Sequence, residues 1–520
     1  MKEDGFVRNT MKKNIALIML ITILSKFIGF FREIALTYFY GASATSDVYL
    51  VAQSIPVTFF GMIGAGIAVS FIPVYNNALK AGGKKEANAF TSRITNLVFL
   101  ISTLIVAVVL LFTKPVVMLF ASGFSSEVMD MAVSFTRITI FAVYFTGALA
   151  VFNAYLQIHN SFLVTAFLGI PMNFVAIISF FIASKSNDHV LAYGVIASYI
   201  IQMFILIPEV LKHKFNYTPL FSPKNEYVKA LLILAIPVIL STSVNQINVL
   251  VDKNIASNIT TGGISALNYA NRLFGFIQGL FVAPIITVIY PNISRMVVDN
   301  KEDGVKKTLH ETIVTVSLLV IPATIGAMIF AEPIVNFLFL RGQFDAVAAA
   351  MTSDALFYYA LGLLPFSLWS IINIVFYSYN DTKTPMILGF VSVVLNVALN
   401  LLLSYFIGIG GLALASSISS IVTTIVLLRS LRKKMPTLKF RNTATTMVKI
   451  LAMSLLMGLV AFGTYGVLHG TVSDNLALVL SVGVGVIVYG LSILLLKIPE
   501  VESILSLGKE KLKNLRNRGR

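Results

Sequence analysis

Charged side chains within otherwise apolar runs are the residues of this sequence that can do chemistry. Lys26, Arg32 and Glu33 lie in one such run, and Arg272 lies in another. Each is a candidate functional residue, because an ionisable side chain deep in a membrane costs roughly 2.5 to 3.5 kcal/mol on insertion scales. A guanidinium group binds phosphate through paired hydrogen bonds, and a lysine adds a point charge. The set therefore favours an anionic, phosphate-bearing ligand.

The two arginines occupy matching positions in their runs. Arg32 precedes Gly41 by nine residues, and Arg272 follows Gly263 by nine. At the helical rise per residue, both lie about 14 Å below the outer end of their spans and could face one cavity. Adjacent helical residues point about 100° apart, so we expect Arg32 and Glu33 to lie on different faces. The alternative is that Arg32 pairs with Glu33 or snorkels, and that Arg272 caps backbone carbonyls.

The elements that must position these residues are membrane helices. The 520 residues are 57% hydrophobic and 12% charged, which is about half the charge of a soluble protein. The apolar runs are roughly 20 residues or longer, enough to span a bilayer as helices, and they lack the alternation of barrel strands. We predict an all-α membrane protein with fourteen transmembrane helices.

Orientation follows from the basic residues, which give a formal charge of +16. Most of them fall in the gaps between apolar runs on one side, whereas Lys114, Lys185, Lys253 and Arg341 lie on the other. The positive-inside rule therefore predicts cytoplasmic N- and C-termini. This placement indicates topology and not nucleic-acid binding, although the basic tail has a minority interpretation as a site for anionic lipid or a partner.

The order of the spans predicts two six-helix lobes and a final pair. An offset of 218 residues aligns Gly61 with Gly279 and Pro73 with Pro291. Because six is even, the repeats are parallel and would surround a central cavity. The predicted parts are a first lobe at 1–215, a second lobe at 216–435, two helices at 436–500 and a basic cytoplasmic tail at 501–520.

Enzymatic interpretations have little support in the sequence. There is no cysteine, the five histidines are scattered, and acidic residues within the spans are few, so we predict that the protein is not an enzyme.

Asn396 and Asn400 lie one helical turn apart. Such residues more often join helices than ligate ions, although a carboxylate such as Asp252 beside amide oxygens suits a hard cation. Thr384 is predicted to cap the helix that starts with Pro385.

Several motifs carry a resemblance to a known family. They begin with Ser25-Lys-Phe-Ile-Gly29-Phe-Phe-Arg32-Glu33, continue through Tyr40-Gly41 with Asp47, and reach Ser70-Phe-Ile-Pro73. Further matches follow in the order Tyr269-Ala-Asn-Arg272, Gln278-Gly279, Pro291, Arg341-Gly342-Gln-Phe344 and Asp381-Thr-Lys-Thr-Pro385. From about residue 14 to 435 the chain resembles the MurJ (MviN) family of the multidrug/oligosaccharidyl-lipid/polysaccharide exporter superfamily.

The resemblance implies a flippase in the bacterial cytoplasmic membrane. Its substrate would be lipid II, an undecaprenyl-diphosphate-linked peptidoglycan precursor, moved from the inner to the outer leaflet by alternating access. The last two helices would form a groove for the lipid tail, and the chain, surrounded by membrane lipids, would act as a monomer.

The same resemblance assigns site residues. It implies that the substrate is bound by Lys26, Arg32, Glu33, Asp47 and Arg272. Some family members hold a sodium ion in the second lobe, and this resemblance implies that a possible sodium ion would be held by Asp252, Asn396, Asn400, the carbonyl of Leu412, and Ser416. No other cofactor is implied.

One departure from the family pattern keeps an alternative open. The second span lacks the usual arginine, where Phe60 stands, and Ala65 replaces the usual acid before Gly66. The chain could therefore export another polyprenyl-diphosphate saccharide, such as a teichoic-acid or exopolysaccharide precursor. A drug/cation antiporter and a non-transporting scaffold are further alternatives, of which the antiporter would need carboxylates facing its substrate.

Overall fold

The structure is a computed structural model that describes residues 2–219, 222, 224–438, 440–496 and 501–502. Of the basic tail predicted at 501–520, residues 503–520 lie outside the described residues. Within the described residues all regular elements are helices, and one isolated bridge joins His469 to Val472. The predicted all-α class is confirmed.

The apolar runs form these helices for a physical reason. A chain in hydrocarbon has no water to satisfy its backbone N–H and C=O groups, and a helix satisfies them internally. Nine helices of the described part of the chain are long and apolar enough to cross a membrane, and the number is eleven when two bent pairs each count as one span. Large apolar side chains such as Leu401, Phe406 and Val486 are exposed, as expected for a lipid-facing surface. The chain is therefore a multi-pass helical membrane protein.

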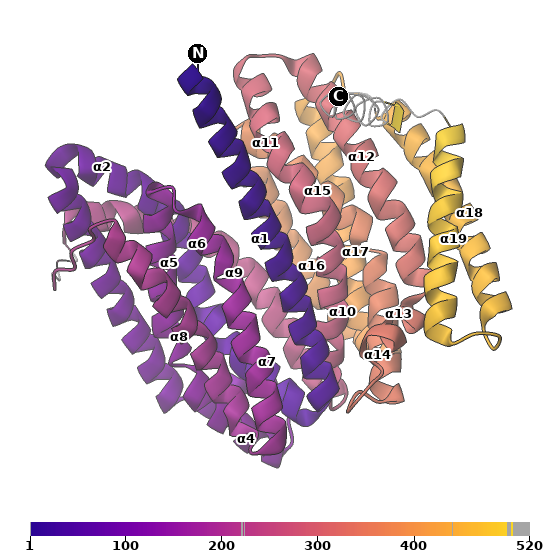
Figure 1. Cartoon of the computed structure of the whole chain (residues 1–520), viewed down its shortest axis with the longest axis horizontal. Coiled ribbons are helices and arrows are strands. Elements are labelled where there is room, and N and C mark those ends of the chain that lie inside the picture. The colour runs from indigo at the N-terminus through magenta and orange to yellow at the C-terminus, as the bar shows by residue number, and fades with distance from the viewer. Residues whose placement is uncertain (1, 220–221, 223, 439, 497–500, 503–520) are drawn as a thin grey trace. The chain divides into compact units, whose positions relative to one another are not determined.

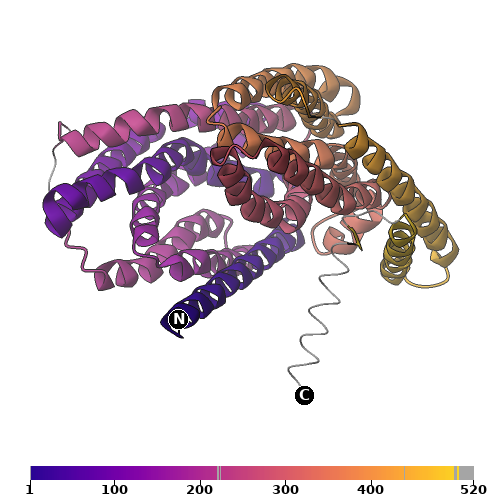
Figure 2. The ribbon, with the colours of Figure 1, turned by 90° about the horizontal axis from the view of Figure 1, so that it is seen from above.

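The chain divides into two compact units, and each is described by itself. Unit 1 comprises Met1–Ser265 and Arg341–Ala348, and unit 2 comprises Ala266–Leu340 and Ala349–Arg520. Figure 1 labels their helices, and Figure 2 shows the same ribbon from above. Helix α10, Gly263–Ile277, begins in unit 1 and continues into unit 2.

Unit 1 is built around one very long helix, α2, which packs against α5 and α9. Its backbone leaves helical geometry at Gly82 and Gly83, which separates α2 into two long apolar stretches. The helices of unit 1 are α1 (Lys2–Tyr40), α2 (Ala44–Leu111), α3 (Thr113–Phe120), α4 (Ser126–Thr139), α5 (Ala142–Ile158), α6 (Phe162–Phe167), α7 (Gly169–Lys185), α8 (His189–Lys212) and α9 (Glu226–Ile259).

Unit 2 has its main core where α12, α15 and α17 meet. Leu309, Ile371, Phe376 and Leu427 are buried in it. The helices of unit 2 after α10 are the π-helix η1 (Gln278–Val282), α11 (Ala283–Val298), α12 (Glu302–Ile329), α13 (Ala331–Phe339), α14 (Ala346–Ala360, whose first residues belong to unit 1), α15 (Leu363–Ser378), α16 (Lys383–Ile407), α17 (Ile409–Lys434), α18 (Arg441–Leu468) and α19 (Asp474–Leu495).

The last two helices pack on each other and on α12 of the same unit. Figures 1 and 2 both show α18 and α19, in yellow, side by side. Ile450 of α18 and Ile493 of α19 share a buried cluster with Leu318 of α12. The Tyr489 hydroxyl donates to the Leu318 carbonyl at 2.8 Å, so α19 is also held by a polar contact.

The turn between α15 and α16 corrects one prediction. Thr384 does not cap the helix, because it lies inside α16, whose cap residue is Thr382. The capping oxygen belongs to Asp381, which accepts from the Thr384 backbone N–H at 3.0 Å. Asp381 also pairs with Lys434 at 2.9 Å. The prediction placed the cap residue two residues late, because the Asp381 side chain reaches a backbone donor three residues ahead and takes the capping role.

Candidate substrate-binding site

Arg32 of α1 forms an ion pair with its neighbour in the sequence. Its Nη2 atom lies 2.5 Å from Oε1 of Glu33, and the two side chains are 12% and 4% exposed. The expectation that they occupy separate faces is wrong, because a long guanidinium side chain reaches around the helix even though the Cβ atoms point about 100° apart. The pairing alternative is confirmed.

Lys26 and Arg272 are more accessible than Arg32. Lys26 lies in α1, nearly two turns before Arg32, and its side chain is exposed. Arg272 lies in α10 and is also exposed. The structure therefore brings Arg32 and Glu33 into contact, places Lys26 on the same helix, and places Arg272 on a helix of unit 2.

Asp47 has a structural environment. It lies in the first turn of α2, is 1% exposed, and accepts from the backbone N–H groups of Gly262 at 2.8 Å and Ser265 at 2.7 Å. The Ser265 hydroxyl donates to it at 2.6 Å. A carboxylate in this position satisfies backbone donors at the start of α10 and opposes the positive end of that helix. Asp47 thus fixes the beginning of the helix that carries Arg272.

A second group of predicted motif residues meets at a backbone junction in unit 1. The Gln343 N–H donates to the Tyr38 carbonyl at 3.0 Å, which joins the Arg341-Gly342-Gln-Phe344 segment to the end of α1. A Cβ on Gly342 would lie 2.2 Å from the Tyr38 oxygen, and a Cβ on Gly41 would lie 2.3 Å from the Gln343 oxygen. Both glycines also have positive φ. These residues are needed because no side chain fits where the two backbones meet.

Phe60, which stands where the family pattern has an arginine, belongs to the packing of α2 against α5. It is 1% exposed, and a Cβ on Gly147 of α5 would lie 3.0 Å from its ring. The ring fills space that the glycine leaves open. This position therefore contributes packing and no cation.

The residues assigned to sodium fall in both units. In unit 2, Asn396 donates to the Ser416 hydroxyl at 3.0 Å, and Asn400 donates to the Asn396 oxygen at 2.9 Å. Leu412 is fully buried, and Asp252 belongs to unit 1. A hard cation needs converging oxygens, whereas these amides point hydrogens at neighbouring oxygens. The network joins α16 to α17 by direct hydrogen bonds, and the sodium site stays a prediction.

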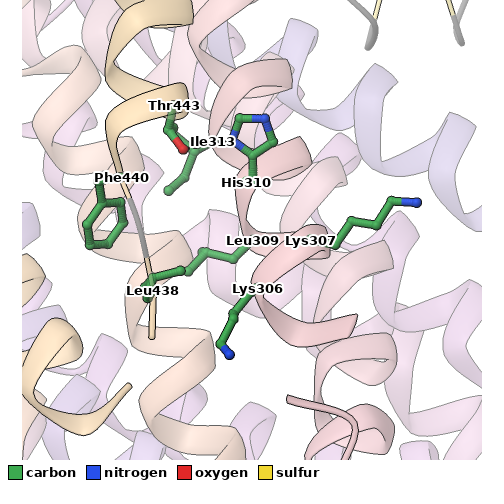
Figure 3. Close-up of a pocket in the computed structure, with 8 residues that line it drawn as sticks. All are labelled: Lys306, Lys307, Leu309, His310, Ile313, Leu438, Phe440 and Thr443. Atoms are coloured by element: carbon green, nitrogen blue, oxygen red, sulfur yellow. Dashed lines mark hydrogen bonds between the residues drawn. The ribbon is translucent and has the colours of Figure 1, made fainter. Parts of the chain in front are cut away.

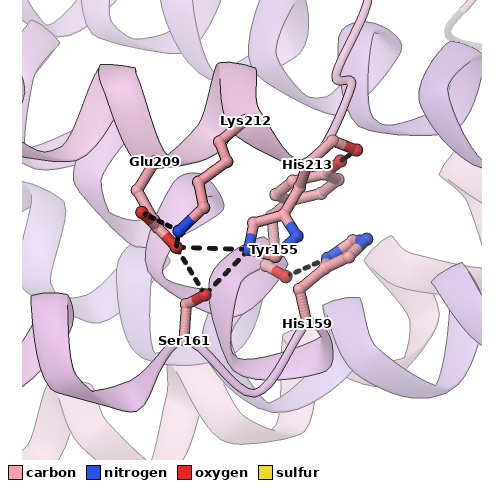
Figure 4. Close-up of polar contacts among 6 residues, drawn as sticks. All are labelled: Tyr155, His159, Ser161, Glu209, Lys212 and His213. Carbon is pink, nitrogen blue, oxygen red and sulfur yellow. Dashed lines mark hydrogen bonds and ion pairs between the residues drawn. The ribbon is translucent and has the colours of Figure 1, made fainter.

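A polar cluster at the ends of α5 and α8 contains the residue types of a catalytic triad without its geometry (Figure 4). Ser161 Oγ lies 2.8 Å from His213 Nε2 and donates to Glu209 at 3.0 Å. Glu209 also lies 3.4 Å from the same Nε2 atom. A triad needs the acid on the opposite ring nitrogen, where it orients the base. The cluster therefore ties the turn after α5 to the end of α8.

Comparisons with known proteins agree with this architecture. The sequence profile of the family described as lipid II flippase MurJ matches residues 35–483. The chain is 30% identical over 438 residues to a probable lipid II flippase MurJ of Vibrio cholerae, covering 82% of this chain and 83% of that one. It is 28% identical over 505 residues to a protein of the same description from Thermotoga maritima, covering 96% and 99%.

Solved structures give the same answer for the fold. A structure described as lipid II flippase MurJ in an inward closed conformation matches with a TM-score of 0.81 at 26% identity, covering 92% of this chain and 98% of that one. An inward-facing MATE family multidrug transporter matches with a TM-score of 0.67 at 15% identity, covering 82% and 99%, which shows a shared fold. A transporter family and not an enzyme family thus accounts for nearly the whole chain. The chain belongs to the lipid II flippase MurJ family.

Proposed function

We propose that this protein moves lipid II from the inner to the outer leaflet of a bacterial cytoplasmic membrane. The observation that carries the proposal is the family match over residues 35–483, combined with a buried guanidinium in a membrane helix. Arg32, Lys26 and Arg272 supply the cationic groups, and phosphate is the anion that such groups bind best in a low-dielectric site.

The ion pair gives Arg32 a resting partner. Glu33 stabilises the guanidinium while no substrate is bound, since an unpaired charge in this position would be costly. A diphosphate that enters the site competes with Glu33 for the same hydrogen-bond donors. Release then restores the pair. While the diphosphate holds the guanidinium, the Glu33 carboxylate has lost Arg32 as its partner, so Glu33 opposes tight binding and favours release.

The proposed architecture is two six-helix lobes followed by two helices. Counting α2 as two spans on either side of its break, and adding α1 and α9, raises the eleven candidate spans to the predicted fourteen. The proposed parts are 1–215, 216–435, 436–500 and the tail 501–520, with both termini in the cytoplasm and α18 and α19 forming the groove for the lipid tail. One chain contains both lobes, so a monomer is sufficient.

A contact within unit 1 supports the parallel repeat. Asp47 and Ser265 are separated by 218 residues, which is the offset that aligns the two predicted repeats, and they hydrogen-bond to each other. Equivalent residues of two repeats can touch only near the axis that relates them. Such an axis runs along the membrane normal. The proposed repeats surround a central site on this axis and open it alternately to the two faces.

The decisive experiment is complementation of a bacterium depleted of its own lipid II flippase, with outer-leaflet lipid II labelled enzymatically. We expect wild type to restore labelling and Arg32→Ala and Arg272→Ala to fail at matched expression. Arg432→Ala removes an arginine from the last turn of α17 and should behave as wild type. No restoration by well-inserted wild type would instead favour export of another polyprenyl-diphosphate saccharide, for which the missing cation at Phe60 is the specific observation.

A further inference from the structure

One membrane span, which lies in unit 2 from Ala266 onward, contains a π-turn close to Arg272. Helix α10 continues through η1 into α11 as one candidate span, Gly263–Val298. The Ala283 N–H donates to the Gln278 carbonyl five residues earlier, which is the hydrogen bond of a π-turn. Such a turn contains one extra residue, so it rotates α10 by about 100° relative to an uninterrupted helix. The π-turn therefore influences which way Arg272 faces.

Gln278, the first residue of the π-turn, is fixed to a second interrupted span. That span consists of α14 and α15, bends by 45°, and resumes after its break at Leu363. The Gln278 Nε2 group donates to the Leu363 carbonyl at 2.8 Å and to the Ser367 hydroxyl at 3.1 Å. The Ser367 hydroxyl in turn donates to the Leu363 carbonyl at 2.6 Å. The π-turn, a rare element in helices, is thus stabilised by contacts from outside its own helix.

Phe274 docks α10 in the bend of the same interrupted span. Its ring centroid lies 5.7 Å from that of Tyr359, in α14, and 5.3 Å from that of Phe366, in α15. Phe274 and Gln278 are four residues apart, so they hold the same side of the helix. Arg272 precedes Phe274 by two residues, which is about 200° around the helix, and Arg272 is exposed. Docking of one side of α10 therefore places Arg272 on the opposite side.

The bend between α14 and α15 is held by α17. The Ser417 hydroxyl donates to the Tyr358 carbonyl at 2.7 Å, and the Thr424 hydroxyl donates to the Pro365 carbonyl at 3.0 Å. Tyr358 lies before the break and Pro365 lies after it. A Cβ on Gly362 would lie 2.8 Å from the Ser417 hydroxyl oxygen, so the two helices approach closely at the break. These contacts give α10 a fixed surface on which to dock.

We propose that Gln278 is a positioning residue for Arg272. Its amide stabilises the π-turn against the bend of α14 and α15, and the π-turn sets the rotation of α10. Arg272 then faces the phosphate of the substrate only while this contact is made. The role rests on the proposed function, because it takes Arg272 to bind the lipid II diphosphate. Gln278 acts through Arg272 and needs no contact with the substrate.

Binding of lipid II to the purified full-length protein in nanodiscs tests the dependence on Arg272. Gln278→Met keeps the length of the side chain and removes its donor, and it should weaken binding by on the order of tenfold. In an Arg272→Ala background the same substitution should change binding by less than about twofold. Gln202→Met is the matched control and should bind as wild type does, because Gln202 is buried and donates to Ser198 of its own helix. An equal loss in both backgrounds, or no loss in either, would overturn the proposal.

Cysteine labelling measures the orientation of α10 without any substrate. The protein has no cysteine, so Arg272→Cys introduces a single thiol. Gln278→Met should slow its reaction with a water-soluble thiol reagent by about threefold or more, because a rotation of about 100° moves this position toward the packed neighbours of α10. Lys307→Cys is the reference, since the Lys307 side chain is 79% exposed at the edge of a pocket beside α12 (Figure 3), and its rate should not change. An unchanged rate at position 272, or equal slowing at both positions, would count against the role of Gln278.

The two measurements separate this inference from the proposed function. If wild type binds no lipid II, the proposed function fails, and the labelling rate still decides whether Gln278 orients α10. If lipid II binds and the labelling rate is unchanged, Gln278 loses its role and the proposed function stands. Should Gln278→Met fail to insert, Ser367→Ala carries the same test, because it removes a hydroxyl partner of Gln278 from the α15 side.

Discussion

The Arg32–Glu33 pair concentrates structure and proposed function in two adjacent residues. Both side chains are nearly buried, so each charge depends on the other for its stabilisation. An arginine that is already paired binds diphosphate only by exchange. In the proposed mechanism, the pair therefore influences how tightly the substrate is held, with Arg32 contributing to binding and Glu33 to release.

Replacing one residue of this pair should destabilise the protein more than replacing both. We expect Glu33→Gln and Arg32→Gln each to lower the free energy of unfolding by about 3 kcal/mol, because each removes the opposite charge of this ion pair from a nearly buried side chain. The double variant Arg32→Gln/Glu33→Gln should be more stable than either single variant. Thermal unfolding in lipid nanodiscs measures this coupling.

An exposed ion pair is the matched control for that coupling. Lys301 and Asp299 lie 3.1 Å apart with side chains 68% and 41% exposed, so the same cycle there should give a coupling below about 1 kcal/mol. Additive effects at Arg32 and Glu33 would mean that the two charges are stabilised separately, and the exchange mechanism would then fail.

Asp47 is expected to act through structure, although the family resemblance placed it in the binding site. Asp47→Asn puts an amide where three donors converge, and it should destabilise the protein by about 3 kcal/mol while the folded protein binds lipid II as wild type does. Asp345→Asn is the control, because Asp345 is exposed and accepts one backbone N–H, from Ala348 at 2.8 Å. Lost binding in a well-folded Asp47→Asn protein would restore Asp47 to the site.

At the scale of elements, the junction of α1 with residues 341–344 depends on backbone proximity. Gly342→Ala introduces both positive-φ strain and a clash with the Tyr38 oxygen, so we expect a loss of about 3 kcal/mol or more. Gly470→Ala has the same kind of φ but open space around the new methyl group, and should lose about 1 kcal/mol. Chemical denaturation measures the free energy of unfolding of both variants. Equal losses would mean that the backbone at the junction shifts to accommodate the added methyl group.

The turn before α16 is held by an ion pair that responds to acid. Burial raises the pKa of Asp381, but hydrogen bonds from Lys434 and Thr384 outweigh it, so the pKa lies below its ordinary value. Lys434 also lies 5.5 Å from the rings of Phe376 and Tyr379. The pair thus connects three helices at one end of unit 2.

A lowered carboxylate pKa fixes the direction of the pH dependence. The contribution of Asp381 to folding stability is fully present above its unfolded pKa of about 3.9. It is lost as the pH falls through the lower pKa of the folded state. The stability difference between wild type and Lys434→Met should therefore shrink below about pH 4. Melting temperatures across this range test it, and a difference that stays constant would show that Lys434 acts through its aromatic contacts alone.

Helices were predictable from the sequence to a greater extent than contacts. The long apolar runs form helices, some of them as bent pairs, because such runs in a membrane have no other backbone solution. The partner of Asp47 could not be predicted, since Ser265 is 218 residues away. The pairing of Arg32 with Glu33 was misjudged because helix periodicity fixes where Cβ points and not where a long side chain ends.

At the scale of the whole molecule, the contact between Asp47 and Ser265 connects sequence symmetry to transport. The proposed alternating access by two parallel repeats needs a place near their common axis where the chain holds together while each face opens in turn. A buried carboxylate that accepts three hydrogen bonds at 2.6 to 2.8 Å is such a place. In the proposed mechanism, the helices move about this polar contact during transport.

Transport in this direction should draw on the membrane potential. The proposed substrate carries a diphosphate, and each negative charge that moves outward through an inside-negative membrane gains roughly 2.3 kcal/mol per 100 mV. Collapsing the potential while the proton gradient is clamped should therefore slow the appearance of lipid II in the outer leaflet of cells complemented by this protein. Restoring the potential with a potassium diffusion gradient should recover the rate, which separates the electrical force from ion supply. Unchanged export at zero potential would mean that the anionic headgroup crosses with its charge compensated by a co-transported cation, and the simple electrophoretic account would be abandoned.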